Sequence, residues 1–211
     1  MNDLIAHLPL FLAAYAILVV AASSPGPAVA FLLGVATSQG RGPALVATTG
    51  IAFGSVTLNL LTLAGVGLLI ANAAWAMQVL RLIGAAYLLW LAYNAFRKAV
   101  HPPHLAAVTV TPRGAAKHFT AGYLLQVTNP KAIVFWLAIA AVGATEGGTP
   151  IVIAAFVAGA FAISFACHGA WAVLLSSRPF RQGYQAARRW IEAALGGFFT
   201  FAAFKLATSE S

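Results

Sequence analysis

The chain has 211 residues, of which 61% are hydrophobic and only 8% are charged. Soluble domains carry about 25% charged residues, and a soluble protein of this composition would expose large apolar patches, so we expect one membrane domain over residues 1–211. The net charge of +8 is typical of basic cytoplasmic loops in a membrane protein rather than of a nucleic-acid-binding protein. The single cysteine, Cys167, excludes an intramolecular disulfide and a multi-thiolate metal site.

The first apolar run covers residues 4–22, which is about the length that spans a bilayer. A cleaved signal peptide is the alternative, because the sequence Ala-Ala-Ser at residues 21–23 resembles a cleavage site. Residues 1–3 carry no positive side chain, although a signal peptide begins with a positively charged region. We therefore expect a retained span, followed by Ser-Ser-Pro-Gly-Pro at residues 23–27 and a short apolar piece at residues 28–36.

Five further apolar runs follow, each long enough to cross a hydrocarbon core of about 30 Å as a helix. Only helices and closed barrels satisfy the backbone in lipid, and runs as long and continuous as these are not barrel strands. The sequence thus predicts an all-α polytopic membrane protein with about six spans, at residues 4–22, 45–70, 76–96, 119–142, 151–175 and 190–207.

The basic residues of the loops are unevenly distributed. The loops after the second and fourth spans carry no Lys or Arg, whereas those after the first, third and fifth carry nine. Because positively charged loops stay in the cytoplasm, we expect both termini outside it and a cytoplasmic loop at residues 97–118. The nine residues are Arg41, Arg97, Lys98, Arg113, Lys117, Arg178, Arg181, Arg188 and Arg189.

The two halves of the chain resemble each other weakly, since residues 28–33 are similar to residues 132–137. Two halves with three spans each must point in opposite directions through the membrane. Inverted repeats of this kind are typical of transporters, and the substrate site lies where the halves meet. We expect repeat halves at residues 1–100 and 119–208, joined by the loop 97–118.

The sequence Ser24-Pro25-Gly26-Pro27 interrupts an apolar region. Two prolines around a glycine break a helix, because proline has no backbone N–H and cannot continue a helix interior. Non-helical backbone at membrane depth is tolerated only where it is buried in protein or lines a wet cavity, where its carbonyls and a helix N-terminus can face a ligand. We expect these four residues to line a substrate path; the alternative is a plain loop at the cytoplasmic surface.

A second polar interruption lies in the fourth span, at Gln126, Asn129, Pro130 and Lys131. A lysine at membrane depth is costly and is a functional candidate by default, and the two amides add hydrogen-bonding groups on nearby turns. The alternative is that Lys131 extends to an interface and that the span begins later. The two Pro-containing interruptions occupy matching places in the two halves, and paired interruptions of this kind are the best sequence indication of a transporter site.

Three further polar residues lie within predicted spans. Asn59 either lines the substrate path or bonds to a neighbouring helix. His168, Glu192 and Lys131 are each candidates for carrying a proton. Glu192 follows Arg188 by one helical turn, so a surface ion pair is the other expectation for it.

Several motifs are missing from the sequence. It has no GxxxxGK[ST] phosphate loop, and Asp3 is its only aspartate, which leaves no Ser-His-Asp triad. The paired carboxylates that a metal or polyamine exporter needs within the membrane are missing as well. We therefore expect neither an enzyme nor a bound metal or cofactor.

These residues resemble the LysE/RhtB family of bacterial amino-acid exporters over nearly the whole chain. The resemblance rests on the motif at residues 24–27, on Asn-Pro-Lys-Ala at residues 129–132, on Gly-Arg-Gly at residues 40–42 and on Gly-Ala-Ala-Tyr-Leu at residues 84–88. It implies a six-helix, homo-oligomeric exporter of the bacterial inner membrane that is driven by a proton or ion gradient. Ala28 departs from the family, which often has Asn or Asp after Pro-Gly-Pro, and this removes one polar ligand.

The charge inventory favours a neutral amino acid as the substrate. A zwitterion needs a positive group for its carboxylate and carbonyls for its ammonium, and Lys131 and the two Pro-containing segments supply these. The expected mechanism is alternating access, with the two halves rocking around that site. The alternatives are an exporter of another solute class, such as a metal cation or another metabolite, and a non-transporting membrane scaffold.

Overall fold

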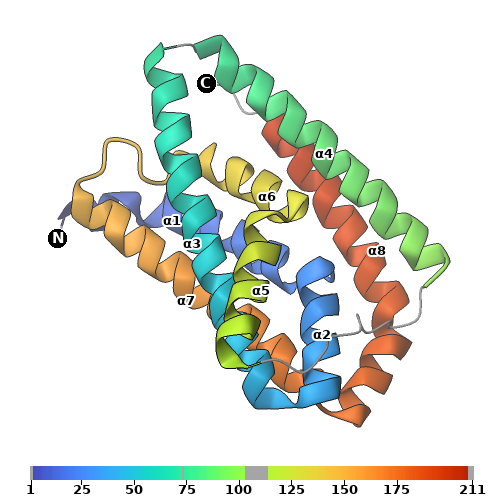
Figure 1. Ribbon diagram of the computed structural model, residues 1–211. Coiled ribbons are helices and arrows are strands. Elements are labelled where there is room, and N and C mark those ends of the chain that lie inside the picture. The colour runs from blue at the N-terminus through green and yellow to red at the C-terminus, as the bar shows by residue number, and fades with distance from the viewer. Residues whose placement is uncertain (1, 73, 103–113, 209–211) are drawn as a thin grey trace. The chain divides into compact units, whose positions relative to one another are not determined.

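The computed structural model describes residues 2–72, 74–102 and 114–208, and within these ranges it consists of helices without any strand (Figure 1). The predicted all-α class is thereby confirmed. In chain order the helices are α1 (Asn2–Ser23), α2 (Pro27–Gln39), α3 (Arg41–Asn72), α4 (Ala74–Val100), α5 (Ala115–Val127), α6 (Pro130–Ala140), α7 (Pro150–Leu174) and α8 (Arg178–Thr208).

Proline and glycine set most of the helix boundaries. Pro27 and Pro130 are the first residues of α2 and α6, where a missing backbone N–H costs nothing. Gly40, between α2 and α3, has a φ of 87°, a conformation that glycine adopts without a side-chain clash. At the second interruption α5 and α6 meet at 60°, so the predicted fourth span, residues 119–142, is two helices rather than one.

In the part of the chain that the structure describes, four helices are long and apolar enough to cross a membrane, and the bent α5–α6 pair adds a fifth if it counts as one span. The four lie at Asp3–Ser23, Arg41–Gly65, Pro150–Leu174 and Arg178–Thr208. A polytopic membrane protein is thus confirmed. Helix α4 covers the predicted third span but is not among these helices, so the number of six spans stays a prediction.

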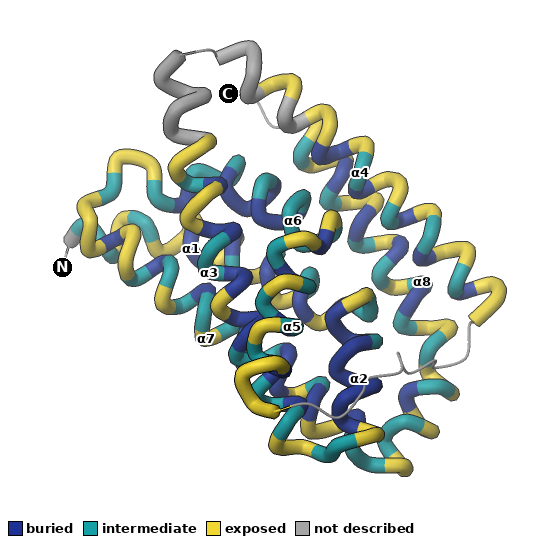
Figure 2. Tube along the Cα trace, in the orientation of Figure 1, coloured by how far each residue is buried: buried dark blue, intermediate teal, exposed yellow. Residues whose placement is uncertain are grey.

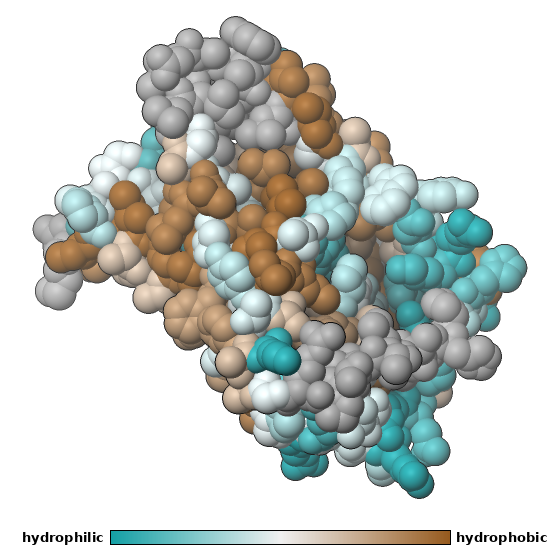
Figure 3. Space-filling model, viewed as in Figure 1, coloured by the Kyte–Doolittle hydropathy of each residue, from teal (hydrophilic) through white to brown (hydrophobic). Residues whose placement is uncertain are grey.

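Large apolar side chains lie on the protein surface as well as inside it. Phe53, Leu60 and Leu61 on α3 and Leu124 on α5 are between 48% and 63% exposed. Figure 3 shows hydrophobic residues gathered over these two helices. In water such a surface would drive aggregation, whereas lipid acyl chains solvate it.

The chain divides into two compact units. Unit 1 contains Met1–Val66 and Ala107–Ser176, and unit 2 contains Gly67–Ala106 and Ser177–Ser211. Unit 2 is built on the pairing of α4 with α8, where the ring of Phe96 packs directly over Gly196. Each unit combines segments from both predicted repeat halves, and the repeat and the single transporter domain stay predictions.

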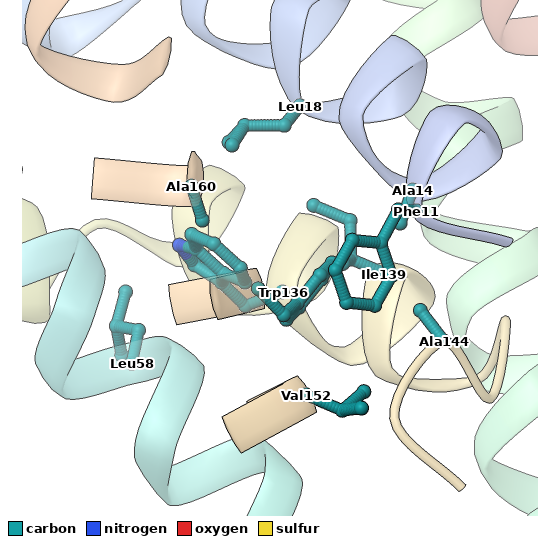
Figure 4. Close-up of a cluster of buried hydrophobic side chains, with 10 residues drawn as sticks. Phe11, Ala14, Leu18, Leu58, Trp136, Ile139, Ala144, Val152 and Ala160 are labelled. Carbon is teal, nitrogen blue, oxygen red and sulfur yellow. The ribbon is translucent and has the colours of Figure 1, made fainter. Parts of the chain in front are cut away.

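Unit 1 holds two apolar clusters. The Trp136 cluster joins the middle of α1, the middle of α3, α6 and the first half of α7; Figure 4 shows Trp136 among its neighbours. The Leu32 cluster joins α2, the first half of α3 and the end of α7, and it accounts for the buried α2 in Figure 2. The Trp136 cluster comprises Phe11, Ala14, Leu18, Leu58, Trp136, Ile139, Ala144, Val152, Phe156 and Ala160. The Leu32 cluster comprises Ala28, Phe31, Leu32, Val35, Ala36, Ala44, Ala47, Ile51 and Ala172.

Helices α3 and α5 approach each other closely through glycine. A Cβ added to Gly50 would lie 2.0 Å from the Phe119 carbonyl oxygen, and one added to Gly122 would lie 2.2 Å from the Ala47 carbonyl oxygen. Close backbone approach through small residues is a common way for helices to associate in a membrane, where lipid removes the hydrophobic drive between them.

The Gly50→Ala variant is therefore expected to lower the thermal unfolding midpoint of the detergent-purified protein. The added methyl group must push α3 and α5 apart, and overpacking of this kind costs about 1–3 kcal/mol. The Gly42→Ala variant is the matched control, because no described residue lies within 4 Å of a Cβ at that position. Equal midpoints for the two variants would contradict the close α3–α5 contact.

Candidate functional site

The two Pro-containing interruptions meet in unit 1. The Lys131 ammonium, at the start of α6, donates to the Ser24 carbonyl oxygen at 2.8 Å and also bonds to the Ser24 hydroxyl. The last carbonyls of a helix have no intrahelical donor, and Ser24 directly follows α1. Lys131 thus satisfies a carbonyl that the break leaves open.

Asn129 holds the start of α6 in place. Its side-chain oxygen accepts a hydrogen bond from the Lys131 backbone N–H at 3.1 Å, and its backbone oxygen accepts from Ile133 at 3.0 Å. Asparagine is a favoured N-cap residue for this reason. The cap fixes the direction in which the first turn of α6, including Lys131, enters the site.

Opposite Lys131, a chain of hydrogen bonds links three helices. The Gln126 amide on α5 donates to the Ser55 hydroxyl on α3 at 2.9 Å, and the Ser55 and Ser164 hydroxyls are 3.0 Å apart. Ser164 on α7 is followed one turn later by His168, whose Nδ1 lies 2.9 Å from the Ser164 carbonyl oxygen. All four side chains are at most 5% exposed. Buried polar groups of this kind are expensive unless bonded, so the network fixes the facing surfaces of these helices.

A small cavity lies between these groups. It has a volume of about 30 Å³ and is lined by Ser24, Gly26 and Lys131 and by the Gln126–Ser55–Ser164–His168 chain. Apolar side chains, among them Phe135 and Trp136, complete its wall. A cavity of this size is large enough for water. An amino acid is several times larger, so the cavity must widen before it can hold one.

The structure brings most of the predicted path residues together. Ser24, Gly26, Pro27, Gln126, Asn129 and Lys131 all line the cavity, as does His168. Pro25 and Pro130 do not line it, and they act by ending one helix and beginning another.

Asn59 is buried on α3 but is not among the residues that line the cavity. Glu192 belongs to unit 2 and is likewise not a lining residue. The expected surface ion pair is wrong in one respect: Glu192 is only 2% exposed, and its carboxylate lies 3.7 Å from the Arg188 guanidinium. Packing of α8 against α4 in unit 2 turns this face of the helix inward, which the one-turn spacing alone does not reveal.

Sequence reasoning missed Ser55 and Ser164. A serine in an apolar helix usually bonds to its own backbone, so it carries little signal alone. The two serines are 109 residues apart, and this spacing is the sequence signal that could have linked them. It is close to the 104 residues that separate the similar segments at 28–33 and 132–137.

Groups of three or more His, Cys, Asp or Glu side chains that could hold a metal ion do not occur among the described residues. The cavity instead combines a cation, carbonyl and hydroxyl groups, an amide and aromatic rings. This donor set suits a small molecule that has both polar and apolar parts.

Comparison with known proteins identifies the kind of transport involved. The model of the LysE type translocator family matches residues 19–210. The chain belongs to the LysE family. This LysE translocator is 30% identical to the threonine efflux protein of Escherichia coli (strain K12) over 200 residues, which cover 91% of this chain and 94% of that protein. The threonine efflux protein of Salmonella typhi is equally similar over the same extent.

A leucine efflux protein of Salmonella typhimurium is 34% identical over 114 residues, which cover 54% of this chain and 53% of that protein. No solved structure matches this LysE translocator. Family membership confirms a transporter of the bacterial inner membrane and not an enzyme, and together with the named relatives it supports the predicted amino-acid export.

Proposed function

We propose that this LysE translocator is a secondary exporter of small neutral amino acids and that the cavity in unit 1 is its substrate site. The observation that carries the proposal is the contact of the Lys131 ammonium with the Ser24 carbonyl inside a buried polar cavity. An ammonium already occupies a carbonyl site there, and an amino acid brings an ammonium of its own.

The cavity offers a partner for each end of a zwitterion. When the substrate enters, its ammonium takes over the Ser24 carbonyl, and Lys131 turns to the substrate carboxylate, a charge-assisted hydrogen bond. The start of α2 lies beside this position, since Pro27, Ala28 and Val29 line the cavity, and a helix N-terminus favours an anion. Ala28 supplies only backbone here, where the family often has a polar side chain.

The remaining residues of the cavity wall suit a substrate with a neutral side chain. Phe135 and Trp136 offer apolar contact to an aliphatic group, and the Ser55 and Gln126 side chains offer hydrogen bonds to a hydroxyl. None of the described residues that line the cavity is acidic, so a cationic side chain or a metal cation finds no counter-charge. Threonine and leucine, after which the relatives are named, both fit this description.

The last part of the proposal is that export proceeds by alternating access and is driven by a proton gradient. Of the predicted proton carriers, we favour His168, because its imidazole lines the cavity and is joined to Ser55 through Ser164. Glu192 in unit 2 is the alternative. The same proposal places both termini outside the cytoplasm and includes the inverted repeat and a homo-oligomer. Reporter fusions at the C-terminus test the orientation. The particle mass in detergent tests the oligomeric state.

Efflux from proteoliposomes tests the proposed function. Vesicles are loaded with labelled threonine, leucine, lysine and glutamate, and the external buffer is set either equal to or more acidic than the lumen. We expect threonine or leucine to leave faster under the proton gradient, and lysine and glutamate to be retained. Preferred release of lysine would contradict a neutral substrate, and release of none of the four would move the function to another solute class or to a scaffold.

A further inference from the structure

Asn59 on α3 is a buried amide that bonds to no other group in the described part of the chain. The residue is 1% exposed, and among the residues that the structure describes no group bonds to either its side-chain nitrogen or its side-chain oxygen. Nearly all buried side-chain polar groups in proteins are satisfied, because an unpaired one costs free energy. An apolar residue of similar size would avoid that cost, so the amide at this position calls for an explanation.

The position of Asn59 connects it to the cavity. It follows Ser55, a cavity residue, by four positions, and such residues lie on the same face of a helix, about 6 Å apart along its axis. Three positions further, Thr62 is also buried, and its hydroxyl donates to the carbonyls of Leu58 and Asn59. A buried polar row thus leaves the cavity along α3, in the direction away from Arg41.

That direction is outward under the orientation proposed above, since Arg41 marks the cytoplasmic end of α3. The Trp136 cluster lies on the same side of the cavity. Leu18, Trp136 and Ile139 belong both to this cluster and to the cavity wall, and Leu58, which precedes Asn59, packs in it as well (Figure 4). The cluster therefore closes the outward side of the cavity, and Asn59 lies on α3 at the level of this closure.

We infer that Asn59 is a second binding station for the exported amino acid, used after the substrate leaves the Lys131 cavity. This inference rests on the proposed function. A carboxamide has a donor for the substrate carboxylate and an acceptor for its ammonium, and it carries no charge. It binds the zwitterion more weakly than Lys131 does, which favours release, since transport needs a site that the solute can leave. The Thr62 hydroxyl oxygen, which accepts no hydrogen bond from the part of the chain that the structure describes, extends the station by one turn.

The Asn59→Leu variant separates this role from a structural one. It removes the unpaired amide at nearly constant volume, so the unfolding midpoint is expected to stay the same or to rise. Labelled threonine and leucine are expected to bind the purified variant within twofold of wild type, while gradient-driven efflux falls at least tenfold. The Asn94→Leu variant is the control, because that amide donates to the Trp90 carbonyl on α4 of unit 2.

Each other outcome overturns the inference. Unchanged efflux makes Asn59 a tolerated structural residue, and a parallel loss of binding and efflux places it in the primary site instead. If Asn59→Leu does not fold, Asn59→Ser, which keeps a hydrogen-bonding group, is expected to retain most of the efflux, and its complete loss would count against the station. If the wild type releases neither threonine nor leucine, the proposed function itself is wrong. This outcome distinguishes failure of the proposed function from failure of the Asn59 inference.

Discussion

Replacement of Lys131 by methionine is expected to abolish gradient-driven efflux of threonine and leucine. Methionine keeps most of the length and apolar contact of the side chain but removes the charge and the donor to the Ser24 carbonyl. Lys131 is the one Lys or Arg residue among the described residues that line the cavity. A hydrogen bond to a charged group contributes about 1.5–3 kcal/mol, which corresponds to a loss of affinity of roughly 10- to 150-fold.

The measurement combines equilibrium binding of labelled threonine or leucine with efflux from proteoliposomes. Lys117→Met is the matched control, because it makes the same chemical change at an exposed position of α5 that does not line the cavity. Lys131→Arg is expected to retain part of the binding, since it keeps the charge with a different shape. Wild-type efflux by Lys131→Met would show that the lysine only satisfies the end of α1 and that the substrate site lies elsewhere.

Replacement of Gly26 by valine is expected to reduce efflux about tenfold or more. A Cβ at Gly26 would lie 3.3 Å from the Lys131 ammonium nitrogen and 3.4 Å from its Cδ, so the valine methyl groups occupy the space of the lysine side chain. Displacing the ammonium from Ser24 costs a charge-assisted hydrogen bond, and a loss of about 1.4 kcal/mol already lowers affinity tenfold. The backbone at Gly26 is extended, with φ of −164°, a conformation open to valine.

Gly114→Val is the control for this variant. Gly114 is also an extended N-cap glycine, at the start of α5, and none of the described residues lies within 4 Å of the place that a Cβ would take there. We expect wild-type efflux and an unchanged unfolding midpoint for Gly114→Val. Equal efflux by the two valine variants would mean that the space over Gly26 is not part of the substrate site.

The amino-acid sequence by itself determined the class of the protein and the two segments that carry its polar chemistry. In lipid, an apolar run of spanning length must form a helix to satisfy its backbone hydrogen bonds. The helices therefore follow from composition and length alone. Pro27 and Pro130 indicate the breaks, because a proline cannot continue a helix, and a lysine in an apolar run is costly enough to be conspicuous. Both signals are local, and both motifs line one cavity.

Only the tertiary structure decided how those segments are completed. Whether a serine in a span bonds to its own backbone or to another helix depends on which helix faces it, so Ser55 and Ser164 became part of the site only through the packing of α3 against α7. Helix packing likewise placed Asn59 outside the cavity and buried Glu192 in unit 2. Hydropathy reports how much of a helix is apolar. Which neighbour each helix face meets is set by contacts between segments far apart in the chain, and a local sequence pattern does not encode such contacts.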